Sequence, residues 1–377
     1  SGKISRIKIC LLIIIGMLRR FIYICATIFF TSCQVDFETL KEATPLLYTK
    51  ASHLHFAYED NLNLTELNII APTKIVWCDS ICVILTPQSH YRIVVYDLRS
   101  GELKRFVPAG IGKNEGLYFL NLHCMGSVVS SFDYGMGRLV EIDLMHYTEP
   151  GYEPKFTVLA GKKNNPLGAI RCGKQIISTG IYPQGRYCCF NTESHIETYS
   201  VAYPNCANQS MSDSLKSIFY ASNSLVFHPL GERIACANMQ YGCLDICEVV
   251  NDSLKRINEV HLTRANIKVQ HKRLSRKSTW YPIAYRERNI FGFCDLAVSD
   301  EYIYALYSGR SYEEYGTDID KGRVIFIFDW TGHHIRTLHI PISCSSISYD
   351  KNSNTIYALA QENGHSEIIT INLSNNE

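Results

Sequence analysis

Short apolar runs rich in Val, Ile, Tyr and Phe alternate, from about residue 51 onward, with clusters of Gly, Asn, Asp and Ser. Runs of this kind between turn-forming residues are typical of β-strands. The segment "KIVWCDSICVILT" (74–86) predicts two strands around a turn, and "YRIVVYDLRSGELKRFVP" (91–108) predicts two more. Long stretches with apolar residues at i, i+3, i+4 and i+7, which would indicate helices, are missing here. The pattern therefore predicts an all-β fold.

The predicted strands recur as a unit in which an acidic residue follows the third strand. The segments "RIVVYDLRSG" (92–101), "GRLVEIDLMH" (137–146) and "RVIFIFDWTG" (323–332) place Asp97, Asp143 and Asp329 there, and "RYCCFNTESH" (186–195) places Asn191 there. Such a side chain can accept hydrogen bonds from its own backbone and start a turn. We expect each of these residues to begin the turn into an outermost strand.

The repeated units predict a β-propeller. They lie near residues 66–110, 117–160, 167–203, 218–263, 291–340 and 342–377. Similar units that cannot bury their faces alone are typical of this architecture, so we predict six blades, with seven as the alternative. A strand from the N-terminal side, either "HLHFAYE" (53–59) or "LTELNII" (64–70), should complete the last sheet, because an open ring would expose unpaired strand edges.

The beginning of the chain has a different pattern. From Met17, the first methionine, the sequence "MLRRFIYICATIFFTSC" (17–33) has a basic stretch, an apolar stretch and small residues before a cysteine. This order is typical of a secretory signal. The cysteine makes it resemble a bacterial lipoprotein signal and predicts lipidation at Cys33. We therefore expect a signal segment (1–32), a tether (33–50) and a β-propeller (51–377).

A transmembrane helix and a buried helix are the other interpretations of this segment. Residues 21–32 would form about 18 Å of helix, against a hydrocarbon core of about 30 Å. A longer span would place Arg19 and Arg20 inside the membrane, at about 2.5–3.5 kcal/mol each. Nothing else in the sequence looks helical enough to pack against a buried helix. The lipoprotein signal is therefore the favoured interpretation.

Charge and cysteine content narrow the function classes. Residues 1–32 contain five basic and no acidic residues, so the rest of the chain has a net charge of −4, which does not suggest a nucleic-acid binder. Of the 15 cysteines, Cys10, Cys25 and Cys33 belong to the leader, and most of the other 12 lie in apolar strand-like runs, where a thiol acts as a small hydrophobe. Cys78 and Cys82 flank a predicted turn and are candidates for a bond across a hairpin. The CxxxC spacing of Cys243 and Cys247, without a third cysteine nearby, argues against a zinc or iron–sulfur site.

Two stretches carry a resemblance to a known family. The segment "GIGKNEGLYF" (110–119) resembles the glycine-rich turn "G-x-G-P-G-E-F" of six-bladed propeller lipoproteins, with Asn114 in place of the proline. The segment "DEYIYALYSGRSYEEYG…GRVIFIFDWTG" (300–332) is similar to the TolB-like six-bladed propeller family of exported, mostly lipid-anchored proteins. The resemblance implies a fold and an envelope location, and it assigns no site residues.

The sequence contains no familiar catalytic or metal-binding motif. A nucleophile elbow, a P-loop, a Rossmann fingerprint and HExxH are all missing. His53 and His55 would face the same way on a predicted strand but lack a third ligand. The two carboxylates of "DIDKG" (318–322) fall short of the six to eight oxygens that calcium takes. We therefore expect no cofactor, no metal site and no catalytic residues.

Two stretches are candidates for binding. The loop "YSGRSYEEYG" (307–316) contains Tyr307, Arg310, Tyr312 and Tyr315, residue types that are frequent at binding hot spots. The alternative is that this loop only packs on the propeller.

The second candidate is the basic segment 264–288, which holds eight Lys and Arg residues and one Glu. Trp280 and Arg286 are its candidate binding residues. Its charge would suit an anionic glycan, a lipid surface or an acidic partner, and a solvated loop between blades is the alternative.

These features predict a cell-envelope lipoprotein, at the outer membrane or in the periplasm, with a lipid anchor as its contact with the membrane. Its propeller would be a non-enzymatic platform that binds a protein, peptide or glycan. The alternative is a hydrolase or lactonase with a divalent cation in the central funnel, for which Asp79, Asp133, Asp295 and Glu301 lie near predicted strand ends. A sensor or assembly factor for another envelope complex is a third hypothesis.

Overall fold

A computed structural model describes residues 53–55, 59–159, 165–204, 211–262, 267–269, 272–275, 278–280, 283–285, 287–362 and 364–374. The predicted signal segment, the tether with Cys33, and Arg286 lie outside these residues.

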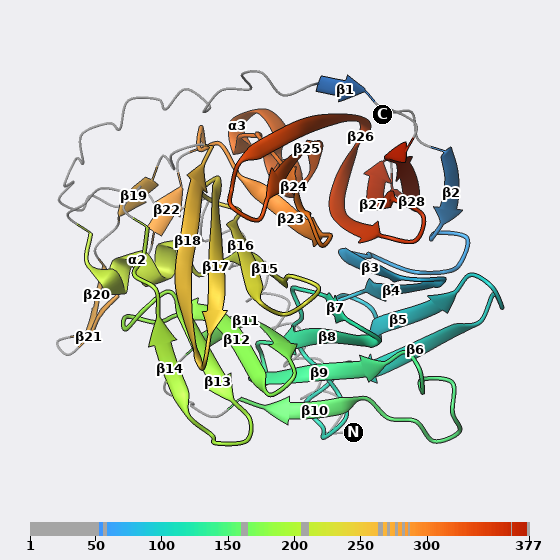
Figure 1. The fold of residues 1–377 in the computed structure, drawn as a ribbon, viewed down its shortest axis with the longest axis horizontal. Coiled ribbons are helices and arrows are strands. Elements are labelled where there is room, and N and C mark those ends of the chain that lie inside the picture. Colours follow the sequence, from blue (N-terminus) through green and yellow to red (C-terminus); the bar gives the residue numbers. More distant parts are fainter. Residues whose placement is uncertain are drawn as a thin grey trace, which may run out of the picture.

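Four sheets of four strands follow one another along the chain (Figure 1). Blade 1 consists of β3 (Lys74–Cys78), β4 (Ile81–Leu85), β5 (Tyr91–Asp97) and β6 (Leu103–Pro108). Blade 2 consists of β7 (His123–Met125), β8 (Val128–Asp133), β9 (Arg138–Asp143) and β10 (Lys155–Val158). Blade 3 consists of β11 (Asn165–Cys172), β12 (Gln175–Ile181), β13 (Tyr187–Asn191) and β14 (Glu197–Ser200). Blade 4 consists of β15 (Asn223–Phe227), β16 (Arg233–Asn238), β17 (Cys243–Val250) and β18 (Ser253–His261).

Blades 5 and 6 share one long strand. Blade 5 consists of β23 (Phe293–Val298), β24 (Tyr302–Tyr307), β25 (Gly322–Asp329) and the first part of β26 (His334–Asp350). Blade 6 consists of the second part of β26, β27 (Thr355–Glu362), β28 (His365–Asn372) and β2 (Glu59–Asn63). Because β26 pairs with β25 through Leu338 and with β27 through Ile347, it is outermost in one sheet and innermost in the next.

The last sheet is completed by β2, which pairs antiparallel with β28. The prediction that an N-terminal strand closes the ring is therefore confirmed, but its position was wrong. The closing strand, Glu59–Asn63, shares only Glu59 with the first candidate segment, 53–59, and ends just before the second, 64–70. The first candidate instead contains β1 (His53–His55), which adds to the outer part of β26 as a parallel strand.

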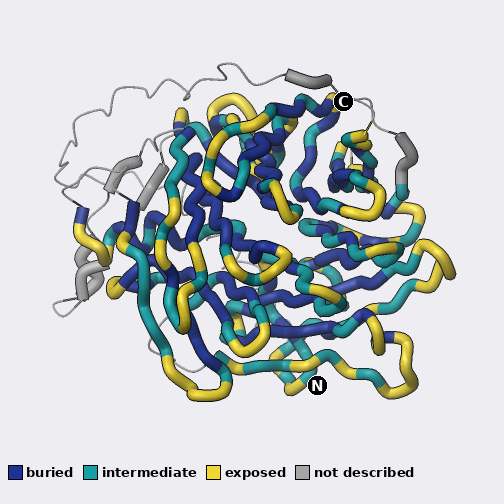
Figure 2. The backbone as a smooth tube through the Cα atoms, viewed as in Figure 1, coloured by how far each residue is buried: buried dark blue, intermediate teal, exposed yellow. Residues whose placement is uncertain are grey.

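Neighbouring blades cover each other's apolar faces. In β4, alternate residues point to opposite sides, so Val83 and Leu85 join the core shared with blade 2, while Cys82 and Ile84 join the core shared with blade 6. Similar buried clusters lie between blades 2 and 3, 3 and 4, 4 and 5, and 5 and 6. Figure 2 shows buried backbone through the middle of the sheets and exposed backbone at the turns.

The six sheets form a closed ring in chain order, as the colours of Figure 1 show. Each innermost strand contacts the innermost strands of both neighbouring blades, and β3 of blade 1 contacts β26 of blade 6. The predicted all-β propeller with six blades is confirmed. The sheets follow the units expected for them, except that β11 begins at Asn165, two residues before its unit, and blade 6 also includes β2.

Asp97, Asp143, Asp329 and Asn191 each end a third strand and start a turn there, as predicted. The Oδ1 atoms of Asp97, Asp143 and Asp329 accept the backbone N–H two residues on, at 2.8, 3.0 and 2.8 Å. Asn191 does the same through its own Oδ1 at 2.9 Å. For Asp97, the hydrogen bond from the N–H of Arg99 lowers the pKa of the carboxyl group below its usual value.

The basic segment 264–288 is not simply a loop. Within it, β19 (Ile267–Val269) pairs antiparallel with β22 (Ile283–Tyr285), and β20 (Lys272–Ser275) pairs with β21 (Ser278–Trp280). The described helices are short: α2 (Asp213–Phe219), α3 (Tyr312–Tyr315) and the 3₁₀ helix η1 (Gly316–Asp320).

Eight of the nine free cysteines in the described chain are buried, as expected for thiols that act as small apolar side chains. Burial raises the pKa of the Cys188 thiol to about 11. Cys82 is among the buried thiols and does not meet Cys78 across the hairpin. Instead, the sulfur of Cys78 in β3 contacts that of Cys124 in β7 and links blades 1 and 2.

Candidate binding face and the polar centre of the ring

The two predicted binding stretches lie at the same end of the blades. Residues 308–321 join the second and third strands of blade 5, and residues 262–292 lead from blade 4 to the first strand of blade 5. Since adjacent strands within a blade are antiparallel, second strands end where first strands begin. We call this end of the ring the connection face.

The loop 308–321 is attached to the end of the basic segment. The N–H of Phe291 donates to the carbonyl of Arg310, and the N–H of Glu313 donates to the carbonyl of Glu287, both at 2.9 Å. Arg288 Nε lies 2.8 Å from Glu313 Oε2. The structure thus brings together the two candidate binding stretches, which are separate in the sequence.

The loop exposes two tyrosines beside an arginine that is held in place. Tyr312 and Tyr315 are 45% and 48% exposed. The guanidinium of Arg310 donates to the carbonyl of Asp318 at 3.0 Å and to Ser343 Oγ at 2.5 Å, and lies 4.6 Å from the centre of the Tyr315 ring. These contacts attach the loop to β26 and to its own backbone while leaving aromatic surface exposed.

Tyr307 is not part of this loop. It is the last residue of β24, is 4% exposed, and lies in the apolar cluster between blades 4 and 5. Its ring packs edge-on against Phe293 and Phe326. The strand continues further than the sequence suggested, and its alternation turns this side chain into the core. Trp280 is the last residue of β21, and its side chain lies outside the described part of the molecule.

Asp295 lies on an innermost strand and joins four blades at the centre of the ring. Its Oδ1 lies 2.8 Å from Lys74 Nζ of blade 1 and accepts a hydrogen bond from Ser224 Oγ of blade 4 at 3.2 Å. Its Oδ2 accepts from Ser346 Oγ at 2.5 Å and from the N–H of Ile347 at 3.0 Å, both in blade 6. Lys74 also donates to the carbonyl of Cys294 at 2.9 Å. Every lone pair of this carboxylate is used inside the protein.

The four carboxylates considered for a catalytic cation do not form one site. Asp295 is paired with an ammonium group, and Asp133 accepts backbone N–H groups of Leu117, Tyr118 and Gly135 at 3.0–3.1 Å. Asp79 and Glu301 are in turns at the end of the blades opposite the connection face. Among the residues that the structure describes, no three His, Cys, Asp or Glu side chains come together as metal ligands.

The glycine-rich segment 110–119 is a turn between blades, as predicted. Arg138 donates to the carbonyls of Gly112, Lys113 and Glu115, and Glu115 in turn accepts the N–H of Gly112 at 2.8 Å. A Cβ atom at Gly110 would collide with the carboxylate of Glu115. These contacts explain the glycine and the charged residues structurally, without a ligand.

His123 is a buried imidazole on the innermost strand β7. Burial lowers the pKa of His123 to about 4, so the ring is neutral at pH 7. It packs near Phe227, with ring centres 6.0 Å apart. This environment keeps the imidazole uncharged.

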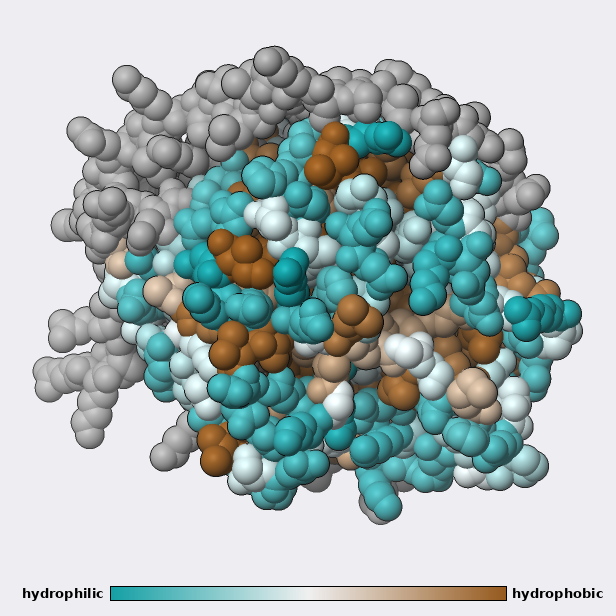
Figure 3. Space-filling view, viewed as in Figure 1, coloured by the Kyte–Doolittle hydropathy of each residue, from teal (hydrophilic) through white to brown (hydrophobic). Residues whose placement is uncertain are grey.

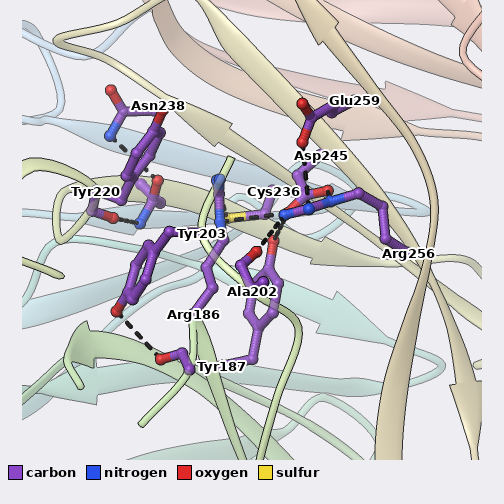
Figure 4. Close-up of polar contacts among 12 residues, drawn as sticks. Arg186, Tyr187, Ala202, Tyr203, Tyr220, Cys236, Asn238, Asp245, Arg256 and Glu259 are labelled. Atoms are coloured by element: carbon purple, nitrogen blue, oxygen red, sulfur yellow. Dashed lines mark hydrogen bonds and ion pairs between the residues drawn. The ribbon is translucent and has the colours of Figure 1, made fainter. Parts of the chain in front are cut away.

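A second ionic cluster lies between blades 3 and 4 (Figure 4). Asp245 in β17 is fully buried, and Arg256 Nε and Arg186 Nε lie 2.7 and 3.3 Å from its two oxygens. Tyr187 Oη donates to Asp245 Oδ2 at 2.9 Å, and Arg256 also pairs with Glu259 at 3.2 Å. Two positive and two negative charges therefore balance inside the cluster.

The buried arginine of this cluster is surrounded by aromatic rings. The Arg186 guanidinium is 1% exposed and lies 4.9 Å from the centre of the Tyr220 ring. Burial alone would raise the pKa of Asp245, but Arg186 and hydrogen bonds from Arg256 and Tyr187 lower it below its usual value. Because no solvent reaches the carboxylate, its role here is to hold two blades together.

Apolar side chains on the surface are dispersed. Figure 3 shows mostly hydrophilic residues on the face viewed, with apolar ones in small separate patches. Ile70, Ile111, Met145 and Leu230 are exposed on different blades or connections. Isolated apolar residues are normal on protein surfaces, so the polar and aromatic groups of the connection face are the stronger candidates for binding.

Comparisons with known proteins give the following matches. A family model described as TolB-like 6-blade propeller-like matches residues 55–351. No curated protein matches the sequence. Among solved structures, the β-propeller domain of Cps50 (Swd1) from Myceliophteria thermophila is 13% identical, with 83% of this chain and 99% of that chain covered, at a TM-score of 0.45. U3-55K and the WD40 repeats of RRP9 are each 9% identical at a TM-score of 0.45, with 81% and 80% of this chain and 96% and 94% of theirs covered.

We predict that Lys74→Met destabilises the ring by about 3–5 kcal/mol, because it leaves the carboxylate of Asp295 buried without its counter-ion. Adding Asp295→Asn should recover part of this loss, since the unpaired charge is then removed. Urea unfolding of the single and double variants measures both effects. Lys104→Met, which removes a more exposed pair with Glu102 at 3.5 Å, is the control and should cost less than about 1 kcal/mol. A cost below that level for Lys74→Met would contradict the role of the central pair.

We predict that Asp245 contributes stability that depends on pH. Because its pKa is lowered in the folded protein, the ionised carboxylate stabilises the fold above about pH 4, and this contribution is lost as the pH falls through the lowered value. Asp245→Asn should reduce the free energy of unfolding by about 3–5 kcal/mol at pH 7. The difference from the unmodified protein should shrink below pH 4. Denaturant unfolding between pH 2 and pH 7 measures this, with the exposed Glu193→Gln as control. A difference that stays constant with pH would contradict the prediction.

Proposed function

The chain belongs to the TolB-like 6-blade propeller-like family. Because its sequence resembles exported, mostly lipid-anchored propellers, we propose that it is a cell-envelope lipoprotein. The lipid is attached at Cys33, and residues 33–50 form a tether to the propeller. The signal-like order of residues 17–33 supports this proposal. In the described part of the chain, no helix has the length and apolar character needed to cross a membrane.

The propeller itself acts as a non-enzymatic platform that binds a protein, peptide or glycan through the connection face. One observation carries this proposal: the loop 308–321 is held by contacts with Glu287, Phe291 and Ser343, yet it leaves the rings of Tyr312 and Tyr315 exposed, the second of them against Arg310. A loop that is already ordered loses little conformational entropy when it binds. Tyr and Arg are also the residue types that contribute most at interfaces.

The packing of the blades does not require these exposed side chains. The apolar clusters between blades are complete without Tyr312 and Tyr315. The hydrolase alternative has no comparable support, because the central carboxylate Asp295 is paired with Lys74. We therefore place the binding function on the connection face.

The lipid anchor predicts how the full chain partitions when it is produced in bacterial cells. The unmodified protein should enter the detergent phase in a Triton X-114 separation and take up a labelled fatty acid. Cys33→Ser should move to the aqueous phase without label, because the acylated thiol is gone. Cys25→Ser, within the same leader, is the control and should behave like the unmodified protein. Labelling that persists in Cys33→Ser would contradict the anchor site.

The binding face predicts the effect of removing the two exposed rings. Tyr312→Ala combined with Tyr315→Ala should lower the recovery of envelope partners in a pulldown by about tenfold or more, as hot-spot residues do. Leu98→Ala combined with Met145→Ala removes two exposed apolar side chains at the opposite end of the blades and is the matched control. Equal recovery by both double variants would argue against the loop as the binding surface.

A further inference from the structure

Two arginines and a serine meet on the connection face, next to the loop 308–321. Arg310 is in the loop, Arg323 is the second residue of β25, and Ser343 is in the middle of β26. Arg310 Nη2 donates to Ser343 Oγ at 2.5 Å, and Arg323 Nε donates to the same atom at 3.0 Å. Of the three, only Arg310 belongs to the candidate binding loop, and Arg323 and Ser343 lie 13 and 33 positions further along the chain.

The hydroxyl of Ser343 has both acceptor lone pairs occupied, so only its O–H donor is available to a ligand. A serine hydroxyl carries one O–H donor and two acceptor lone pairs. Both lone pairs accept from the two guanidinium groups, and no acceptor for the O–H is found among the described residues. The centre of the cluster therefore presents donors and offers no acceptor.

The cluster also carries two positive charges without a partner of opposite sign. Neither guanidinium forms an ion pair within the described chain, and the carboxylate of nearby Asp318 is paired with Lys321 at 3.0 Å. Arginine stays protonated in proteins. Because both donor nitrogens contact one oxygen atom, the two like charges lie close together. This arrangement differs from the Arg186–Asp245 cluster, where charges balance.

We propose that Arg310, Arg323 and Ser343 form a receptor for a doubly charged oxyanion of the phosphate class. This inference rests on the proposed function, because it names the chemistry that the connection face recognises. A phosphate or phosphate monoester carries a charge of about −1.5 to −2 at pH 7 and has several acceptor oxygens. Its charge matches the two guanidiniums, and its oxygens can accept from the Ser343 O–H and from the guanidinium N–H groups of Arg323 that have no described acceptor.

The ring of Tyr315 adds a second contact at this receptor. It lies against the Arg310 guanidinium, 4.6 Å from ring centre to carbon, and remains about half exposed. A phosphoryl group attached to a larger molecule would reach the cluster past this ring. The same oxyanion chemistry serves free phosphate and a phosphate monoester, and only the second would also contact Tyr315.

Isothermal titration of the purified full chain at low ionic strength tests the proposal. Inorganic phosphate, phenyl phosphate and acetate are the three probes. We expect saturable binding of phosphate at one site, tighter binding of phenyl phosphate if a monoester is the natural source, and binding of acetate that is at least about tenfold weaker because it carries one charge. Absent binding of both phosphates, or acetate binding as tightly as phosphate, would overturn the proposal.

Variants separate this receptor from simple charge attraction. Arg323→Gln, at an exposed position outside the loop, should raise the dissociation constant for phosphate at least about tenfold, as expected for a charge-assisted contact. Ser343→Ala should weaken binding although it changes no charge. Arg99→Gln removes an exposed charge at the opposite end of the blades and is the matched control. Unchanged phosphate binding in Arg323→Gln or in Ser343→Ala would overturn the assignment.

A failure of the oxyanion receptor can be distinguished from a failure of the proposed binding platform. If Tyr312→Ala with Tyr315→Ala keeps its partners but Arg323→Gln loses phosphate, the receptor stands and the tyrosine loop is not the partner surface. If the tyrosine variant loses its partners while phosphate does not bind, the platform stands and the oxyanion receptor is refuted.

Discussion

The fold depends on a single constraint: each sheet is apolar on both faces, so each must lie between two others. In β4, Val83 and Leu85 are buried on one side and Cys82 and Ile84 on the other. In a row of such sheets, one apolar face of the first sheet and one of the last stay exposed until these two sheets pack against each other. The strand β2 meets this requirement by completing blade 6 before the chain enters blade 1. Burying about 25 cal/mol per Å² of apolar surface at every interface makes the closed ring the favoured arrangement.

The centre of the ring follows from the same closure. Innermost strands from several blades converge there, and their polar side chains must find partners away from water. The carboxylate of Asp295 forms an ion pair with Lys74 and accepts hydrogen bonds from Ser224 and Ser346, which come from three other blades. Ser346 Oγ also accepts the N–H of Ile75 at 3.1 Å, so the network continues into the backbone of β3. Polar groups that are paired in this way hold the blades together. The loops at the ends of the blades are then the part of the molecule that can bind a partner.

Local patterns in the sequence were enough to predict the blades. Alternating apolar residues and turn-forming side chains such as Asp97 and Asn191 act within a few residues of themselves, so their structural effect can be read directly. The end of a strand is harder to predict. Tyr307 looks like the start of a polar loop, but β24 continues through it and turns its ring inward.

Contacts between distant residues could not be predicted in the same way. Nothing near Lys74 in the sequence indicates a partner 221 positions away, and the balance of Arg186 by Asp245 depends on how blades 3 and 4 pack. The one local signal was a carboxylate inside an apolar strand, as in "CLDIC" (243–247), which indicates a buried charge that needs a partner. The grouping of Arg310 with Arg323 also needs the fold, because β26 brings Ser343 between them.

The two arginine clusters show where the protein can respond to a ligand. Arg186 is buried and its charge is balanced within the fold by Asp245, so an added anion would have nothing to neutralise and no route to reach it. Arg310 and Arg323 are at the surface, where water lowers the cost of keeping two like charges together. A bound anion would remove the remaining repulsion and gain hydrogen bonds that the fold leaves unused. Arginine therefore has a structural role where the fold supplies a carboxylate to pair with it. Where the fold supplies no carboxylate, the same side chain is suited to binding a ligand.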